Sequence, residues 1–405
     1  MTMKANEKKF LIIIFFVSLI IRIGFILTLD NSVDVWGDWW DELGWKIACG
    51  KGYWVNNPYF PDGPKFYAWR SPGFPIFLAL IYKIFGHNFL FAKIGLAILS
   101  SLTCILLYFL TKTLINMKTA CWVSLIYSIY PASIFWTGYL APETFITFLL
   151  VLSIFLLTEW HFNDKKILFF IFGNLTFGFL SITKPTFLAL CPFLILTFAL
   201  MHKKDLLKIL LISSICLSFF PLLWGIRNYK IFNKLFITSS EGGIVFFIAN
   251  NEKSLSSPTG FYHSEDVEEF KGLSEIEIDK LLYKKTFKFI KNNPMLYFKL
   301  VINRFIKFWR LYPHTISGPG ESYKRFHQII SFISETPIII LGTIGILFSF
   351  KEFYKWILLY LTIFLYSGLS ILIRTTIRYR FPIMCFLIIF AIYFLKMTKY
   401  GKKYF

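Results

Sequence analysis

The chain has 405 residues, of which 56% are hydrophobic and 20% aromatic, and its mean hydropathy is +0.60. This apolar content excludes an ordinary soluble protein. The net charge of +20 does not indicate nucleic-acid binding, because the lysines gather at the ends of hydrophobic runs, where they set membrane topology. The composition therefore predicts an all-α polytopic membrane protein with no nucleic-acid partner.

Hydrophobic runs long enough for a bilayer recur along the chain. Residues 1–9 carry three lysines, and no small-residue cleavage site follows the first run, so we expect an anchor helix rather than a removed signal peptide. A run of about 17–25 apolar residues crosses the hydrocarbon core. We predict about ten transmembrane helices, at residues 10–29, 89–113, 120–136, 144–160, 167–183, 185–201, 206–224, 333–350, 356–373 and 381–396.

The lysines between these runs predict the orientation of the chain. If the spans alternate in direction, the lysine clusters fall on the side of the amino terminus, which the positive-inside rule makes the inner side. These lysines are Lys112, Lys118, Lys165, Lys166, Lys203, Lys204, Lys208, Lys351, Lys355, Lys396, Lys399, Lys402 and Lys403. Two long loops, about 30–88 and 225–332, then lie outside. We expect residues 1–405 to form one domain of the plasma or inner membrane, with its site on the outer face.

Short helical signals occur inside these loops. Residues 72–85 are apolar but too short to span, so we expect them along the interface or re-entering the protein. Ser274 and Glu277 match a capping box, and Asn293-Pro294 predicts the start of another helix, with Asn as its cap. A polar stripe on that helix fits either an amphipathic helix on anionic headgroups or a packed loop helix or tilted span. The stripe consists of Lys299, Asn303, Lys307 and Arg310.

Three carboxylates stand together after the first span, interleaved with tryptophans. They are Asp38, Asp41 and Glu42, among Trp36, Trp39, Trp40 and Trp45. Aromatic surroundings exclude water and raise the pKa of a carboxylate, which suits a base that activates a hydroxyl. Tryptophans also stack on sugars or lie in the interfacial belt. A solvated loop with a helix cap is the alternative, and the residues alone leave it open.

Cations from four separate loops return to the same predicted face. They are Arg70, Lys184, Arg227, Arg374, Arg378 and Arg380. A guanidinium binds phosphate in a bidentate manner, so this face suits a lipid phosphate, although any single cation also suits lipid headgroups. Glu143 begins a helix, where a carboxylate also serves as a structural cap. Arg22 lies within the first span, as a functional candidate or a snorkelling side chain.

Several kinds of chemistry lack their sequence signals. We find no P-loop, GxSxG or HExxH motif, and the six histidines are scattered, so an outward site is expected to use an activated lipid as donor. Asp38 and Asp41 have a spacing that suits a divalent metal, but this spacing is common by chance, and we favour no cofactor. Only Cys49 lies clearly in an outer loop, which disfavours a disulfide framework.

A series of short motifs follows in order along the chain. They are Asp41-Glu42-Leu43-Gly44-Trp45-Lys46-Ile47-Ala48 with Gly50-Lys51-Gly52-Tyr53, Arg70-Ser71-Pro72-Gly73-Phe74-Pro75 with Tyr82 and Phe85-Gly86, Tyr130-Pro131, Pro142-Glu143, Lys184-Pro185, Trp224-Gly225-Ile226-Arg227-Asn228-Tyr229, Gly242-Gly243 with Asn250-Asn251, and Arg378-Tyr379-Arg380-Phe381-Pro382. Together they resemble the glycosyltransferase 39 family, the bacterial relatives of protein O-mannosyltransferases and aminoarabinose transferases. The resemblance covers most of the chain.

The resemblance implies a GT-C fold and a polyprenyl-phosphate sugar as donor. It implies Asp41 as catalytic base, with Asp38 as its competitor and Glu42 as a further candidate. It makes Arg70, Lys184, Arg227 and Arg378 candidates for holding the lipid phosphate, and we add Arg380. The supporting residues are Glu143, Trp45 and Asn228.

We therefore predict a membrane glycosyltransferase that moves a sugar to an acceptor hydroxyl on a lipid, glycan or protein. A single base without a second nucleophilic carboxylate fits inversion, by analogy with glycosidases. The alternatives are a lipid-linked polysaccharide polymerase or ligase, and a lipid or anion transporter. The absence of repeated halves and of helices broken near the midplane disfavours the transporter.

Overall fold

The computed structural model describes residues 5–29, 39–60, 62–163, 166–255, 267–313 and 324–398. Within these ranges the regular structure is helical, apart from an isolated antiparallel bridge between Val55 and Phe66. The first helices are α1 (Ala5–Leu27), α2 (Trp40–Ala48), α3 (Gly73–Phe85), α4 (Phe89–Leu114), α5 (Met117–Ile129), α6 (Pro131–Phe135), η1 (Trp136–Gly138), α7 (Glu143–Phe162), α8 (Ile167–Ser181), η2 (Pro185–Leu190) and α9 (Cys191–Met201). The others are η3 (Lys203–Asp205), α10 (Leu206–Phe232), α11 (Gly242–Ala249), η4 (Glu252–Ser254), η5 (Glu268–Phe270), α12 (Glu275–Asn292), α13 (Pro294–Phe308), α14 (Arg325–Ser349), η8 (Phe350–Glu352), α15 (Phe353–Ile373), η9 (Ile377–Arg380) and α16 (Phe381–Met397).

Six stretches of the described residues are long and apolar enough to cross a membrane. They are Ala5–Leu27, Phe89–Leu114, Glu143–Phe162, Lys203–Phe232, Arg325–Ile373 and Ile377–Met397. The fifth stretch, of 49 residues, contains two helices, α14 and α15. Shorter apolar helices lie at two more of the predicted spans, α8 and η2 with α9. The predicted all-α polytopic fold is confirmed.

Two predicted boundaries are wrong for physical reasons. The predicted span 120–136 is interrupted, because Pro131 has no N–H to continue α5 and instead begins α6. The predicted loop start at residue 225 is also wrong, because α10 continues to Phe232. Arg227 and Asn228 were expected in the loop because they are polar. Both lie within the helix, and their side chains donate hydrogen bonds to carbonyls of the loops.

Helix α16 runs through the core of the bundle, and all of its residues from Phe381 to Tyr393 are buried. Two glycines of α14 face its backbone. A Cβ atom on Gly345 would lie 2.0 Å from the carbonyl oxygen of Phe390, and one on Gly342 would lie 2.8 Å from that of Leu387. Small residues allow such close approach of membrane helices, so α14 and α16 form a tightly joined pair.

Arg22 is buried in the bundle and does not snorkel. Its guanidinium donates to the hydroxyls of Ser18, Ser100 and Ser133 at 2.6–2.8 Å. It also donates to backbone carbonyls of α1 and α5. Arg22 therefore joins α1 to α4, α5 and α6 through neutral acceptors, and its role is structural.

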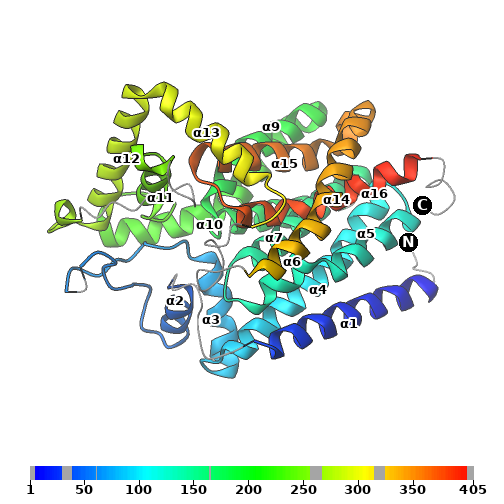
Figure 1. The fold of residues 1–405 in the computed structure, drawn as a ribbon, viewed down its shortest axis with the longest axis horizontal. Helices are drawn as coiled ribbons and strands as arrows, with labels where there is room; N and C mark the ends of the chain where they lie inside the picture. The colour runs from blue at the N-terminus through cyan, green and yellow to red at the C-terminus, as the bar shows by residue number, and fades with distance from the viewer. Residues whose placement is uncertain are drawn as a thin grey trace.

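Helix α2 of the first long loop and helices α11 and α12 of the second lie at one end of the bundle, whereas the start of α1 and the end of α16 lie at the other (Figure 1). We call the first of these the loop end. Here α2 and the residues after it share a hydrophobic cluster with η5 and α12. The buried members of this cluster are Leu43, Val55, Phe66, Trp69, Phe270, Ile278 and Leu282. The loops are therefore a packed layer over the bundle.

Glu275 joins the two loops through its buried carboxylate. Its oxygens accept hydrogen bonds from Tyr67 N at 2.6 Å, Ala68 N at 3.2 Å and Ser240 Oγ at 2.5 Å. Burial raises the pKa of Glu275, although these hydrogen bonds oppose the shift. One turn later, Asp279 accepts from Gly243 N at 2.5 Å, and burial raises its pKa to about 6.

The helices of the second loop begin largely as predicted. The capping box of Ser274 and Glu277 opens α12, and Pro294 occupies the first turn of α13. Asn293 occupies the N-cap position as predicted, but its side chain makes no capping hydrogen bond, and its amide instead donates to the carbonyl of Phe289. The exposed side of α13 carries mainly apolar side chains, namely Met295, Phe298, Ile302, Phe305 and Ile306.

Glu275→Ala is expected to destabilise the loop end, because it leaves buried donors of both loops without their acceptor. The cost is about 2 kcal/mol or more, which for a chain of 405 residues corresponds to a thermal midpoint lower by about 2 °C. Glu269→Ala is the control, since Glu269 forms an exposed pair with Lys285 worth at most about 1 kcal/mol. Thermal unfolding of the purified protein in detergent measures both, and equal midpoints would contradict the assigned role of Glu275.

Candidate active site

Asp41 lies in the first turn of α2, and 9% of the residue is exposed. Its Oδ1 accepts a hydrogen bond from Tyr82 Oη at 2.5 Å. His87 Nε2 lies 3.0 Å from Oδ1 and 2.9 Å from Oδ2. Trp45, one turn along α2, stacks on the His87 ring. The predicted base and the predicted supporting Trp45 therefore belong to one cluster, in which both other members come from α3 and the turn after it.

The two other acidic candidates differ from Asp41. Glu42 points to Lys46 on the next turn, with which it forms an ion pair, and 41% of its side chain is exposed. Lys46 also donates to the carbonyl of Trp54 and lies over that ring. Glu42 thus takes part in an ordinary helix-surface contact. Asp38 lies outside the described residues.

Trp40, the residue before Asp41, lies between two predicted phosphate-binding arginines. The guanidinium carbons of Arg70 and Arg378 lie 5.5 and 5.3 Å from the centre of its ring. Arg70 also forms an ion pair with Glu241. Residues from the first loop and from the turn before α16 therefore meet at this indole.

Arg378 and Glu143 form an ion pair between η9 and the start of α7. Glu143 is 2% exposed. Its Oε2 makes no hydrogen bond with the described part of the chain. A buried carboxylate with one oxygen unpaired depends strongly on its cation. The supporting role of Glu143 stays a prediction, and the structure places this residue against Arg378.

Lys184 enters the same region from the turn between α8 and η2. Its ammonium lies 3.5 Å from the centre of the Tyr379 ring. Burial lowers the pKa of Lys184, although nearby Tyr379 and Glu143 oppose the shift. The start of α3 packs on this turn, since Gly73 N donates to Ile182 O and a Cβ on Gly73 would lie 2.1 Å from Thr183 Oγ1. The segment after Arg70 is thereby held beside Lys184.

Arg227 and Asn228 serve the packing of the loops. Arg227 donates to the carbonyls of Tyr67 at 2.5 Å and Tyr53 at 2.9 Å, and its guanidinium lies over Trp224. Asn228 donates to the carbonyl of Phe236 at 2.9 Å. Both side chains therefore hold loop backbone against the end of α10.

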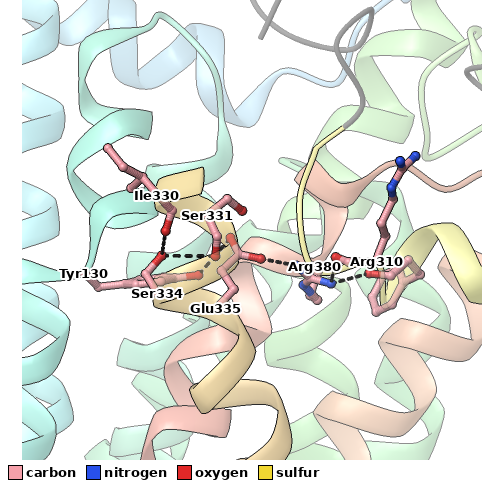
Figure 2. A network of polar contacts seen from close by, with 8 residues as sticks. Tyr130, Arg310, Ile330, Ser331, Ser334, Glu335 and Arg380 are labelled. Atoms are coloured by element: carbon pink, nitrogen blue, oxygen red, sulfur yellow. Dashed lines mark hydrogen bonds and ion pairs between the residues drawn. The ribbon is translucent and has the colours of Figure 1, made fainter. Parts of the chain in front are cut away.

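Arg380 is buried and belongs to a network of polar contacts (Figure 2). It forms an ion pair with Glu335 and donates to the carbonyls of Phe308 at 2.7 Å and Arg310 at 2.8 Å. Tyr130 Oη donates to the other oxygen of Glu335 at 3.3 Å. The network joins α5, α13, α14 and the start of α16.

A cavity of about 320 Å³ lies between α1, α6, α14 and the start of α16. Aromatic and aliphatic side chains form most of its wall, including Phe135, Phe326, Phe381 and Met384. Arg378, Arg380 and Glu335 also line it. An apolar cavity that reaches a guanidinium suits the hydrocarbon of an anionic amphiphile.

Sequence reasoning missed several residues of this region. Tyr82 lies within a recognised motif but carried no assigned role, and His87 directly follows that motif. Glu335 falls inside a predicted span, where a carboxylate is a functional candidate by default. Among the described residues, no three His, Cys, Asp or Glu side chains gather where they could hold a metal ion.

Comparison with known proteins identifies the fold and the family resemblance. Residues 69–224 match the family model of dolichyl-phosphate-mannose-protein mannosyltransferase. The predicted resemblance to glycosyltransferase 39 is confirmed. The matched range contains Arg70, Glu143 and Lys184, whereas Asp41 and Arg378 lie outside it. No curated protein matches the chain in sequence.

Solved structures share the GT-C fold of this chain. The apo oligosaccharyltransferase of Archaeoglobus fulgidus has a TM-score of 0.57 and 13% identity, over 96% of this chain and 50% of its own. AglB of the same organism, in complex with an inhibitory peptide and a dolichol-phosphate, gives 0.56 and 12%, over 97% and 51%. Apo ArnT of Cupriavidus metallidurans gives 0.52 and 12%, over 98% and 62%. The chain thus spans about half the length of the archaeal enzyme.

Arg378→Gln is expected to destabilise the protein by on the order of 3 kcal/mol, because it leaves the buried Glu143 carboxylate without its cation. Adding Glu143→Gln to the same chain should recover most of the lost thermal midpoint, since no buried charge then remains unpaired. Thermal unfolding of the two single variants and the double variant measures this coupling. Additive losses would contradict an energetic link between the two residues.

Proposed function

We propose that this chain is a membrane glycosyltransferase that moves a sugar from a polyprenyl-phosphate donor to an acceptor hydroxyl. One observation carries the proposal: a buried carboxylate, Asp41, adjoins an indole flanked by Arg70 and Arg378, and Arg378 lines an apolar cavity. These parts provide a base, cations for a leaving phosphate and room for hydrocarbon. The family match over residues 69–224 and the GT-C fold support the same activity.

The donor phosphate is proposed to lie between Arg70, Lys184 and Arg378, with its first isoprenyl units in the cavity. Lipid phosphates are also ligands of a protein with this fold, since AglB was solved with a dolichol-phosphate. Arg227 and Arg380 donate to backbone carbonyls, so we propose that they hold the loops and η9 in place. Tyr379, stacked under Lys184, adds a polar hydroxyl to this group.

In the proposed reaction Asp41 takes the proton of the acceptor hydroxyl. The acceptor oxygen forms a bond to the anomeric carbon as the bond from that carbon to the phosphate oxygen breaks, and its electron pair leaves with the phosphate. The cations stabilise the charge that develops there. Attack opposite the leaving group gives inversion. Holding donor and acceptor side by side contributes much of the acceleration.

The site is proposed to face the outside of the plasma or inner membrane. The two long loops share the loop end of the bundle (Figure 1), and the lysine clusters of the sequence favour the opposite end as the inner side. A donor in the membrane then reaches the site from the bilayer. The acceptor class, whether lipid, glycan or protein, is left open by this arrangement.

Asp41→Asn is expected to abolish transfer while the protein stays folded, because an amide side chain cannot act as a base near neutral pH. Glu42→Gln is the matched control: it changes the adjacent carboxylate, which pairs with Lys46, and should retain most of the activity. Transfer from a panel of labelled polyprenyl-phosphate sugars in vesicles with envelope acceptors measures both. If Glu42→Gln lost transfer while Asp41→Asn retained it, the base would be Glu42. Transfer only of multi-sugar donors would favour a polymerase or ligase.

Ile330→Trp is expected to fill part of the cavity and to raise the donor KM about tenfold, as a cost of about 1.4 kcal/mol implies. Little change in kcat is expected, because Ile330 lies away from Asp41. Ile329→Trp places the same ring on a neighbouring side chain that is 52% exposed and does not line the cavity, so it should leave the KM unchanged. Equal donor KM values for folded Ile330→Trp and wild type would place the donor chain elsewhere.

A further inference from the structure

His87 is fixed beside Asp41 by the backbone on both of its sides. Gly86 ends α3 with φ 75°, a left-handed conformation that favours glycine. Asn88 then caps α4, with its Oδ1 accepting from Leu90 N at 2.9 Å. His87 therefore lies between the residue that ends α3 and the residue that caps α4. Both neighbours restrict its backbone conformation.

Aromatic contacts also fix the direction of the His87 ring. It stacks on Trp45 with the ring centres 4.8 Å apart and the planes 8° from parallel. Its other neighbours, Tyr82 and Phe89, meet it edge to face at 5.0 and 5.5 Å. The ring cannot turn away from Asp41 without losing these contacts.

The hydrogen bonds define what His87 offers to Asp41. An ionised carboxylate only accepts, so Nε2 carries the proton and shares it between Oδ1 and Oδ2, at 3.0 and 2.9 Å. Tyr82 donates to Oδ1 as well. Together the two donors hold the carboxylate in one orientation, through both of its oxygens.

We propose that His87 is a positioning residue that orients Asp41 for proton abstraction and, through its own ionisation, lowers the basicity of Asp41 in acid. The proposal rests on the proposed function in taking Asp41 as the base. A neutral imidazole orients the carboxylate, whereas an imidazolium adds a positive charge that weakens it as a base. Within the described ranges, Asp41 from α2 and Tyr82 from α3 are the titratable groups in contact with His87, and α4 contributes the uncharged ring of Phe89.

Two substitutions separate the hydrogen bond from the ring. His87→Phe retains an aromatic ring for Trp45 but has no N–H, and kcat should fall by about 100-fold. His87→Gln retains a neutral donor and should recover part of the activity. Because His87 does not line the cavity, the donor KM should stay unchanged in both. A purely structural role would lower the thermal midpoint and the amount of folded protein without this pattern.

The pH profile supplies the second readout. In the wild type, kcat/KM should fall toward acid in a step that requires His87. In His87→Gln this step should disappear, because glutamine does not ionise. Tyr82→Phe keeps His87 and should keep the step.

The outcomes distinguish this proposal from the proposed function. Inactive Asp41→Asn together with full kcat in folded His87→Phe would overturn the role of His87 and leave the transferase activity standing. A His87→Gln profile identical to that of the wild type would overturn the effect of His87 ionisation. A folded wild type that transfers sugar from no donor would overturn both proposals.

Discussion

The buried carboxylate of Glu275 determines how the loop end is assembled. It accepts from the backbone of residues 67 and 68 and from Ser240, and so joins the first long loop to the second. Arg227 reinforces the same junction from α10 by donating to the carbonyls of Tyr53 and Tyr67. Arg70 follows directly on this backbone, so its position beside Trp40 depends on the junction. The charges of the loop layer thus hold the segments from which the candidate site is built.

The carboxylates of the candidate site have two different kinds of partner. Asp41 is bound by Tyr82 and His87, whereas Glu143 and Glu241 each neutralise one arginine of the proposed phosphate site. This difference matters, because a base paired directly with arginine would be a weak proton acceptor. Acidic partners on Arg70 and Arg378 also reduce the positive charge that an empty site has to carry. The arrangement is consistent with cations that bind a phosphate and release it after each cycle.

Much of the membrane fold was predictable because hydrophobic length and lysine placement are local signals. The apolar runs gave α1, α4, α7 and α16 within a few residues, and the lysine pattern placed both long loops at one end. The break at Pro131 was also visible in the sequence but was outweighed by the apolar run around it. The extension of α10 was not predictable in this way, because tertiary partners satisfy Arg227 and Asn228. The sequence likewise indicated the arginines only as a group. The packing of distant helices then distinguishes them, because Arg378 lies beside Trp40, whereas Arg380 binds backbone carbonyls and Glu335. His87 was missed because a lone histidine carries no spacing signal.

Arg22 has a consequence for the biosynthesis of the protein. The ribosome makes α1 before the hydroxyls and carbonyls of the later helices that bind the guanidinium, at residues 100 and 127–133. When α1 enters the bilayer, this charge has no partner beyond its own helix, at a cost of about 3 kcal/mol on insertion scales. The other residues of α1 are mostly apolar and offset that cost. Docking of α4, α5 and α6 then satisfies the guanidinium, so the charge that opposes insertion of the first helix later favours its association with the next three.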